Sequence, residues 1–246
     1  MENRWSENKA NEFLSRYGPK WGEDLALRTY SSRLLGAETS LVLHGGGNTS
    51  VKATHTNLLG EQVPAIFVKA SGFDMALIEP EGHSGLDLEY LLKLRKLPGL
   101  SNPQMVNEFR THLFDCSSST PSIETLVHAF LPKKFIDHTH ADAVLALTNQ
   151  LDGEKIIREA LGERIIILKY VKPGFKLAKA AAEAFDAHPN AIGMVWMHHG
   201  LATWGDTAHE SYSIMIELVT RAEQYLNHHT TRPLKVLFST PLAQAE

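Results

Sequence analysis

The chain has 246 residues, of which 43% are hydrophobic and 21% charged, as in an ordinary globular protein. Its formal net charge is -4. Nucleic-acid binding normally requires clustered Lys and Arg, so the charge gives no reason to expect it. The single cysteine, Cys116, excludes an internal disulfide, the polar N-terminus does not resemble a signal peptide, and no apolar run approaches the roughly 20 residues of a membrane span. We therefore expect a cytoplasmic globular protein that binds neither nucleic acid nor membrane.

The first half of the chain predicts a helical pair followed by short strands. Residues 6–35 have a helical pattern with a break at Gly18-Pro19. Residues 41–43 and 65–68 are short apolar runs typical of buried strands, and a glycine-rich loop lies between them. Residues 73–120 are less regular, which indicates connecting turns and a peripheral insertion.

From Pro121 onward, the pattern alternates between helix and strand. A helix is expected over 121–131 with Ser122 as its cap. Strands are then expected at 134–140, 165–170 and 192–197, and helices at 141–149, 177–188 and 206–227. This alternation favours a layered α/β fold. Without a repeat or a linker, we expect one domain over 1–246, with its core at about 20–230 and a tail over 231–246.

The loop His44-Gly45-Gly46-Gly47 fails three known glycine-loop patterns. Ser50 stands where a dinucleotide fingerprint needs its last glycine, no Gly-Lys-Ser/Thr of a P-loop occurs, and the nearest hydrolase elbow, residues 82–86, ends in leucine. Consecutive glycines let backbone N–H groups approach an anion such as phosphate, and Asn48, Thr49 and Ser50 add donors. A tight turn between two strands would explain the same residues.

Two histidines in FIDHTHADAV have the spacing of metal ligands. His138 and His140 are two residues apart, so on a strand both side chains leave the same face. In a chain with 13 histidines this spacing also arises by coincidence. A third candidate follows an apolar strand in Met197-His198-His199-Gly200, where only one of the two histidines should join the site. Three imidazoles with an open position are typical of a catalytic zinc site.

A candidate base for such a site is Glu124, in the first turn of the predicted helix. Its alternative role is a capping carboxylate stabilised by the helix dipole. Tyr170, Tyr212 and Tyr225 are candidate proton donors, but each also fits a half-buried core position, so none is assigned.

Two lysines and two tryptophans near these motifs also have positions that the sequence predicts. Lys52 and Lys69 could face an anion, although exposed lysines at strand ends are the simpler interpretation. Trp196 and Trp204 are expected to pack the wall behind the metal.

Four motifs in one order resemble the class II aldolase/adducin family over roughly residues 20–230. They are Gly47-Asn48-Thr49-Ser50, Ala70-Ser71-Gly72, Pro121-Ser122-x-Glu124 with His138-x-His140, and His199-Gly200. The segments VKASGFDMALI, PSIETLVHAFLPKKFIDHTHADA and HHGLATWGDTAHESY are similar to the aldolase region of proteins that join a rhamnulose-1-phosphate aldolase-like domain to a short-chain dehydrogenase. No dehydrogenase fingerprint follows them, so an oxidoreductase half is either absent or on another chain.

The resemblance implies a three-layer α/β/α fold with a central mixed sheet and a divalent metal, most often Zn²⁺. It implies that the metal ligands are His138, His140 and His199 and that Glu124 is the general acid/base. The implied phosphate pocket consists of Gly46, Gly47, Asn48, Ser71, Gly72 and Ser122. Small fuculose-phosphate aldolases have two serines before the glutamate, whereas Ile123 stands here. The resemblance also implies a homo-oligomer, commonly a tetramer with the active site between subunits.

The resulting functional hypothesis is a zinc-dependent aldolase, an aldehyde-lyase that cleaves a ketose 1-phosphate into dihydroxyacetone phosphate and an aldehyde through a metal-stabilised enediolate. A related sugar-phosphate dehydratase or 4-epimerase would use the same metal and pocket. An adducin-like module would keep the fold for binding alone. The intact histidines and Glu124 favour the catalytic alternatives, because converging polar groups are costly without a function.

Overall fold

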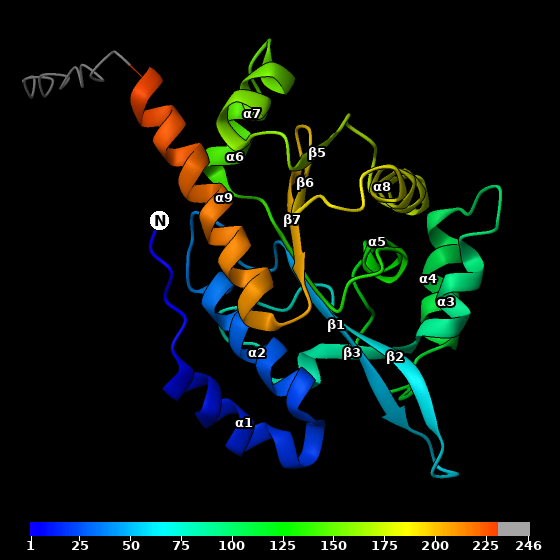
Figure 1. The fold of residues 1–246 in the computed structure, drawn as a ribbon. Coiled ribbons are helices and arrows are strands. Elements are labelled where there is room, and N and C mark those ends of the chain that lie inside the picture. The colour runs from blue at the N-terminus through cyan, green and yellow to red at the C-terminus, as the bar shows by residue number, and fades with distance from the viewer. Residues whose placement is uncertain (231–246) are drawn as a thin grey trace, which may run out of the picture.

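The structure, a computed structural model, describes residues 1–230 and is built around a seven-stranded sheet (Figure 1). The sheet has the order β3-β2-β1-β4-β7-β6-β5. Its strands are β1 (Asn48–Thr56), β2 (Gln62–Lys69), β3 (His83–Asp87), β4 (Phe135–Thr139), β5 (Ile165–Leu168), β6 (Gly193–Trp196) and β7 (Gly200–Gly205). The pair β5·β6 is parallel and the other pairs are antiparallel, so the sheet is mixed, as expected.

Helices cover both faces of this sheet (Figure 1). On one side lie α2 (Glu23–Gly36), α6 (Asp142–Thr148), α7 (Gly153–Leu161) and α9 (Ala208–His229), with α1 (Glu7–Trp21) packed on α2. On the other side lie α3 (Leu88–Leu94), α4 (Asn102–Thr111), α5 (Thr125–Phe130) and α8 (Phe175–Ala187). A separate apolar cluster fills the space between the sheet and each of the two helix layers. All five residues of β4, at the centre of the sheet, are buried. The three-layer α/β/α prediction is confirmed.

The N-terminal helical pair is present, but its break lies at Gly22 rather than at Gly18-Pro19. Gly22 has a φ of 81°, in the left-handed region that favours glycine, and it separates α1 from α2. Pro19 lies inside the last turn of α1, where its missing N–H costs a single helical hydrogen bond.

Residues 41–43 form a turn and coil instead of the expected strand. Their apolar pattern arises because Leu41 and Val42 are buried in the cluster shared with α6 and α9. The first strand begins only at Asn48, directly after Gly47. Residues 73–120 are more regular than expected, since they contain β3 at the edge of the sheet, α3, α4 and a short 3-10 helix, Pro80–Gly82.

The second half follows the predicted alternation with one shortening and two additions. The expected helix over 121–131 is reduced to α5, because Pro121 pairs with Ala70 and the N–H of Ser122 donates to the Lys69 carbonyl. Neither α7 nor β7 was predicted. The expected tail, 231–246, lies outside the described residues. Within the described residues, no helix has the length and apolarity needed to span a membrane.

Candidate active site

Two of the three predicted histidine ligands lie at the end of β4. His138 is within the strand and His140 directly follows it, and their ring centroids are 4.9 Å apart on one side of the chain. Gly200 on the neighbouring β7 leaves room for them. A Cβ at Gly200 would lie 2.4 Å from the Thr139 carbonyl oxygen and 2.8 Å from Cε1 of His138. Glycine is therefore the residue that fits beside this pair.

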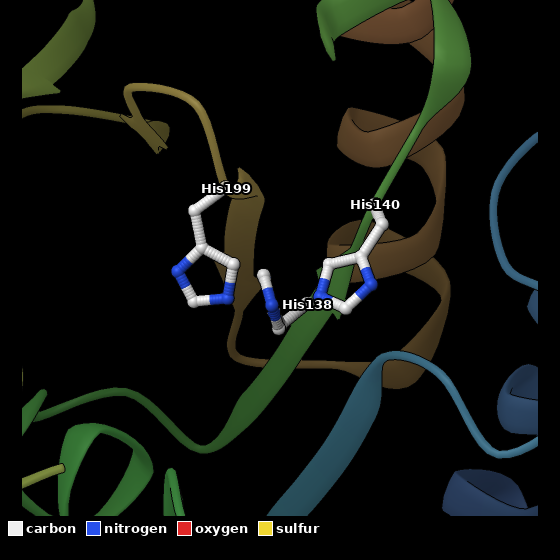
Figure 2. A group of neighbouring side chains, drawn as sticks. All are labelled: His138, His140 and His199. Carbon is white, nitrogen blue, oxygen red and sulfur yellow. The ribbon is translucent and has the colours of Figure 1, made fainter. Parts of the chain in front are cut away.

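The third histidine comes from the turn between β6 and β7. His198 adopts a φ of 60°, which is uncommon for a residue other than glycine, and its Nδ1 lies 2.8 Å from Oδ1 of Asn149. The next residue, His199, directs its ring to the other two. One ring nitrogen of each of His138, His140 and His199 lies within 4.8 Å of the others, and Figure 2 shows the rings facing one another. One of the two adjacent histidines joins the cluster, as the sequence predicts.

The hydrogen bonds of His138 leave one of its nitrogens available. Its Nδ1–H donates to the Leu201 carbonyl at 3.1 Å, so Nε2 is the acceptor, and Nε2 is buried without a hydrogen-bond partner in the described part of the chain. Burial lowers the pKa of His138 to about 3 and also lowers the pKa of His140. Neutral imidazoles, one of them oriented by a backbone carbonyl, form a donor set that fits a divalent metal such as Zn²⁺.

Glu124 lies against this cluster, immediately before α5. Its Oε1 is 3.0 Å from Nε2 of His199 and its Oε2 is 3.5 Å from Nε2 of His138. Its side chain makes no capping hydrogen bond to α5, although capping was the alternative considered from the sequence. Burial would raise the pKa of Glu124, but the two histidines and the Asn48 amide outweigh it and hold that pKa well below its usual range.

Asn48 connects Glu124 to the first strand. Its Nδ2 donates to Oε2 of Glu124 at 2.6 Å and to Oγ of Ser122 at 3.1 Å. Asn48 and Ser122, which were both expected to bind the substrate phosphate, therefore contact each other and Glu124, the expected acid/base.

The glycine-rich loop and the segment after β2 lie beside the same cluster. A Cβ at Gly45 would be 3.1 Å from Cα of Gly72, and one at Gly46 would be 3.7 Å from Nδ1 of His140. The N–H of Ser71 donates to the Thr120 carbonyl at 2.9 Å, which joins this segment to the one that carries Glu124. Four of the six residues expected at the phosphate thus lie beside the histidines or Glu124: Gly46, Gly47, Asn48 and Ser122. The other two, Ser71 and Gly72, contact Thr120 and Gly45 in the neighbouring segments.

The two lysines are not exposed strand-end residues, contrary to the sequence-based expectation. Lys69 is 2% exposed, its Nζ donates to the Gly45 carbonyl at 3.0 Å, and burial lowers its pKa to about 8. The ammonium group of Lys52 donates to three carbonyls at the end of α5, those of His128, Leu131 and Lys133. Burial lowers the pKa of Lys52 to about 7.

The aromatic residues agree with expectation only in part. The ring of Trp196 lies 4.3 Å from that of His138, behind the cluster as expected. Trp204 packs on Phe185 instead. The hydroxyl of Tyr212 accepts from the Arg4 N–H and that of Tyr225 donates to Glu159, so both are engaged away from the histidines.

His128 is a further residue of the site that the sequence analysis treated only as part of a helix. It is fully buried, and its two ring nitrogens contact Ser50 and Asn48. Its spacing of four residues from Glu124, on one helical face, is the signal that could have identified it.

Fold and site together define an α/β/α protein in which three histidines and a glutamate meet at the end of a central strand. The chain belongs to the family described as the class II aldolase and adducin N-terminal domain, whose model matches residues 28–226.

Two known proteins have sequences similar to most of this chain. The uncharacterized oxidoreductase YuxG of Bacillus subtilis (strain 168) is 36% identical over 223 residues, which cover 91% of this chain and 31% of that protein. The chain thus spans less than a third of this curated relative. The N-terminal class II aldolase domain of a conserved Thermoplasma acidophilum protein is 37% identical with a TM-score of 0.82, covering 92% of this chain and 99% of that one.

A more distant solved structure shares the fold. The sugar-phosphate aldolase of Thermotoga maritima has a TM-score of 0.62 at 17% identity, covering 84% of this chain and 97% of that one.

Proposed function

We propose that this chain is a zinc-dependent aldolase that cleaves a ketose 1-phosphate into dihydroxyacetone phosphate and an aldehyde. The observation that carries the proposal is the convergence of one buried carboxylate, Glu124, on three histidines, with Oε1 3.0 Å from His199. The family of the chain and its similarity to a protein named as a sugar-phosphate aldolase support it.

His138, His140 and His199 would hold the metal. When bound, a divalent cation supplies a Lewis acid that stabilises negative charge on the substrate's carbonyl oxygen, a contribution of about several kcal/mol. The Leu201 carbonyl keeps Nε2 of His138 free for this role by accepting a hydrogen bond from Nδ1–H.

Glu124 would move the proton. When the carbon–carbon bond next to the ketone breaks, its electron pair remains on the ketone fragment and the aldehyde leaves. That fragment must then gain a proton at carbon, while the hydroxyl of the leaving fragment loses one. The ionised carboxylate of Glu124 would take up the proton that the hydroxyl loses and then deliver it to that carbon. General acid–base catalysis of this kind contributes about 10²- to 10⁴-fold.

The phosphate end of the substrate would bind in the pocket formed by Gly46, Gly47, Asn48, Ser71, Gly72 and Ser122. Backbone N–H groups of a bare loop and nearby hydroxyls are suited to an anion, and the buried ammonium of Lys69 adds positive charge behind Gly45. Binding energy at this remote group would orient the carbonyl relative to Glu124 and the histidines.

Assembly and partners are part of the same proposal. We propose a homo-oligomer, a tetramer by family resemblance, whose mass light scattering would measure. We also propose that the chain works with a dehydrogenase, because a relative of more than three times the matched length is named an oxidoreductase.

The test begins with metal content, measured on protein purified without chelator or polyhistidine tag. About one ion per chain is expected in the wild type and none in His138→Ala. The zinc-loaded protein is then incubated with a panel of phosphorylated ketoses, and the products are identified by ³¹P NMR and mass spectrometry. Release of two fragments is expected, whereas a dehydratase would release water and a 4-epimerase would yield one isomeric sugar.

Glu124→Gln tests the role of the carboxylate directly. The variant is expected to keep its metal and to lose about 10²- to 10⁴-fold in turnover, because the amide cannot carry the proton. An unchanged rate would exclude Glu124 as the acid/base. Absence of metal even after zinc is added back would favour the non-catalytic, adducin-like alternative.

A further inference from the structure

One face of β1 lies along α5, and side chains on the two elements recur at nearly the same distance along their axes. Asn48 and Ser50 are two residues apart, so they lie on the same face of the strand. Two strand residues advance about 6.6 Å, and four helical residues advance about 6 Å. Glu124 and His128, four residues apart, therefore lie opposite Asn48 and Ser50. Lys52, the next residue on that face, reaches the carbonyl of His128 at 2.7 Å and fixes the end of the helix.

These residues form a continuous buried hydrogen-bond chain. Oγ of Ser50 lies 2.7 Å from Nδ1 of His128, Nε2 of His128 lies 2.5 Å from Oδ1 of Asn48, and Nδ2 of Asn48 lies 2.6 Å from Oε2 of Glu124. All four side chains are at most 5% exposed. Water is therefore a poor substitute for any of these contacts.

The chemistry of the groups fixes the direction of every proton in this chain. An ionised carboxylate only accepts, so Asn48 must present its NH₂ to Glu124 and its oxygen to His128. That oxygen also only accepts, so Nε2 of His128 must carry the hydrogen. Burial lowers the pKa of His128 to about 3, which keeps the ring neutral. Nδ1 therefore accepts a hydrogen bond from the Ser50 hydroxyl. In this series of hydrogen bonds, each residue donates to the next one in the direction of Glu124.

We propose that His128 is a positioning residue for Glu124, acting through Asn48: its Nε2–H, fixed by Ser50, holds the Asn48 amide with the NH₂ toward the carboxylate. The inference rests on the proposed role of Glu124 as acid/base. Without this donor the amide is held only by Glu124 and Ser122, its buried oxygen has lost its partner, and it can rotate by half a turn. Its oxygen would then face the oxygens of Glu124, and the repulsion would displace the carboxylate from the histidines.

The tautomer of His128 is the first test, and it requires no substrate. Two-bond ¹H–¹⁵N NMR on ¹⁵N-histidine-labelled wild-type protein distinguishes protonated from unprotonated ring nitrogens, and His128→Gln identifies the resonances. A neutral ring with the proton on Nε2 is expected at neutral pH. A neutral ring with its proton on Nδ1 would overturn the proposal, since Nε2 would then be an acceptor and Asn48 could not face Glu124 with its NH₂.

The second test measures proton transfer itself. The zinc-loaded protein is incubated with dihydroxyacetone phosphate in D₂O, and exchange of the carbon-bound hydrogen is followed by ¹H NMR. His128→Leu removes the donor at similar volume and is expected to slow exchange by about 10- to 100-fold, the usual effect of removing an outer-shell partner, with metal content unchanged. In His128→Gln a side-chain NH₂ replaces Nε2–H, and most of the rate is expected to return.

Matched variants separate positioning from general damage to the fold. His83→Leu removes another buried histidine that does not contact Asn48, and it is expected to keep the wild-type exchange rate. Ser50→Ala keeps the ring but frees its tautomer, and a smaller loss is expected, so this variant serves if His128→Leu fails to fold. Wild-type exchange in His128→Leu, or in Ser50→Ala where it replaces that variant, would overturn the proposal. No exchange in the wild-type protein would contradict the proposed aldolase function instead, and the tautomer would then decide the present inference.

Discussion

The two faces of β4 carry buried polar side chains that differ in the partners they have. Toward α5, His138 leaves Nε2 without a hydrogen bond within the described chain. Toward α2 and α9, Asp137 lies 2.5 Å from Nη2 of Arg28 and accepts from Oγ of Ser211 at 2.6 Å. These two residues are adjacent and equally buried. Neither burial nor a missing hydrogen bond separates the two faces, because Oδ1 of Asp137 also lacks a hydrogen bond. The difference is that Asp137 pairs with a buried arginine, whereas His138 lies among two further histidines and Glu124.

Asp137→Ala should produce the largest effect, by removing the partner of a buried charge. Arg28 is fully buried, so an unpaired guanidinium should reduce the free energy of unfolding by about 3–5 kcal/mol. Urea denaturation measures this change. The double variant Arg28→Met, Asp137→Leu should recover much of the stability, because it leaves no buried charge. A single variant as stable as the wild type would show that the α2 face is not the structural side of the strand.

Gly200→Ala should affect the opposite face. The new methyl group would meet the Thr139 carbonyl and the His138 ring, so the histidines must shift, and we expect a loss of about 10- to 100-fold in zinc affinity. Competition with a chromophoric chelator measures the affinity. Gly205→Ala is the matched control on β7, since the atoms nearest to its Cβ belong to Glu210 and Ser211 of α9. Equal zinc affinities in the two variants would contradict the prediction.

His83→Gln should have the smallest effect, on the pH dependence of stability. His83 contacts Ser32 of α2, and burial, with the charges of Arg28 and Lys69, lowers its pKa from 6.5 to about 3. Between these values the unfolded chain binds a proton that the folded chain does not, so stability falls as pH falls. The slope is on the order of 1.4 kcal/mol per pH unit.

Urea unfolding of metal-free protein at several pH values from neutral to mildly acidic measures this slope. The variant should lose stability less steeply than the wild type over that range. Identical slopes would mean that His83 is protonated in the folded state.

The spacing of residues within a single strand or turn was enough to predict how some of the histidines lie. The strand period placed His138 and His140 on one face, and the opposed directions of His198 and His199 meant that one would join them. The class of fold likewise followed from the alternation of helix and strand. Residues 41–43 were misassigned because apolar residues buried in coil produce the same short pattern as a strand.

Contacts between distant segments could not be predicted in this way. The start of α5 depends on Ala70 pairing with Pro121, and the burial of Lys69 depends on the Gly45 carbonyl. His128 acquires its role only when β1 lies along α5. A single sequence does not report such pairings, because nothing in the local pattern of one segment specifies its partner.

In the proposed mechanism, the brevity of α5 makes proton transfer dependent on the intact domain. With six residues, it is far shorter than the roughly 12–15 needed for a helix to persist alone in water, so its contacts with β1 and the layer around it must hold it in place. The three histidines lie on β4, directly after it and in the turn before β7, whereas Glu124 depends on α5 and on Asn48 of β1 for its position. If the proposed function holds, turnover therefore requires more of the fold to be intact than ion binding does, and it is the stricter reporter of a completely folded chain.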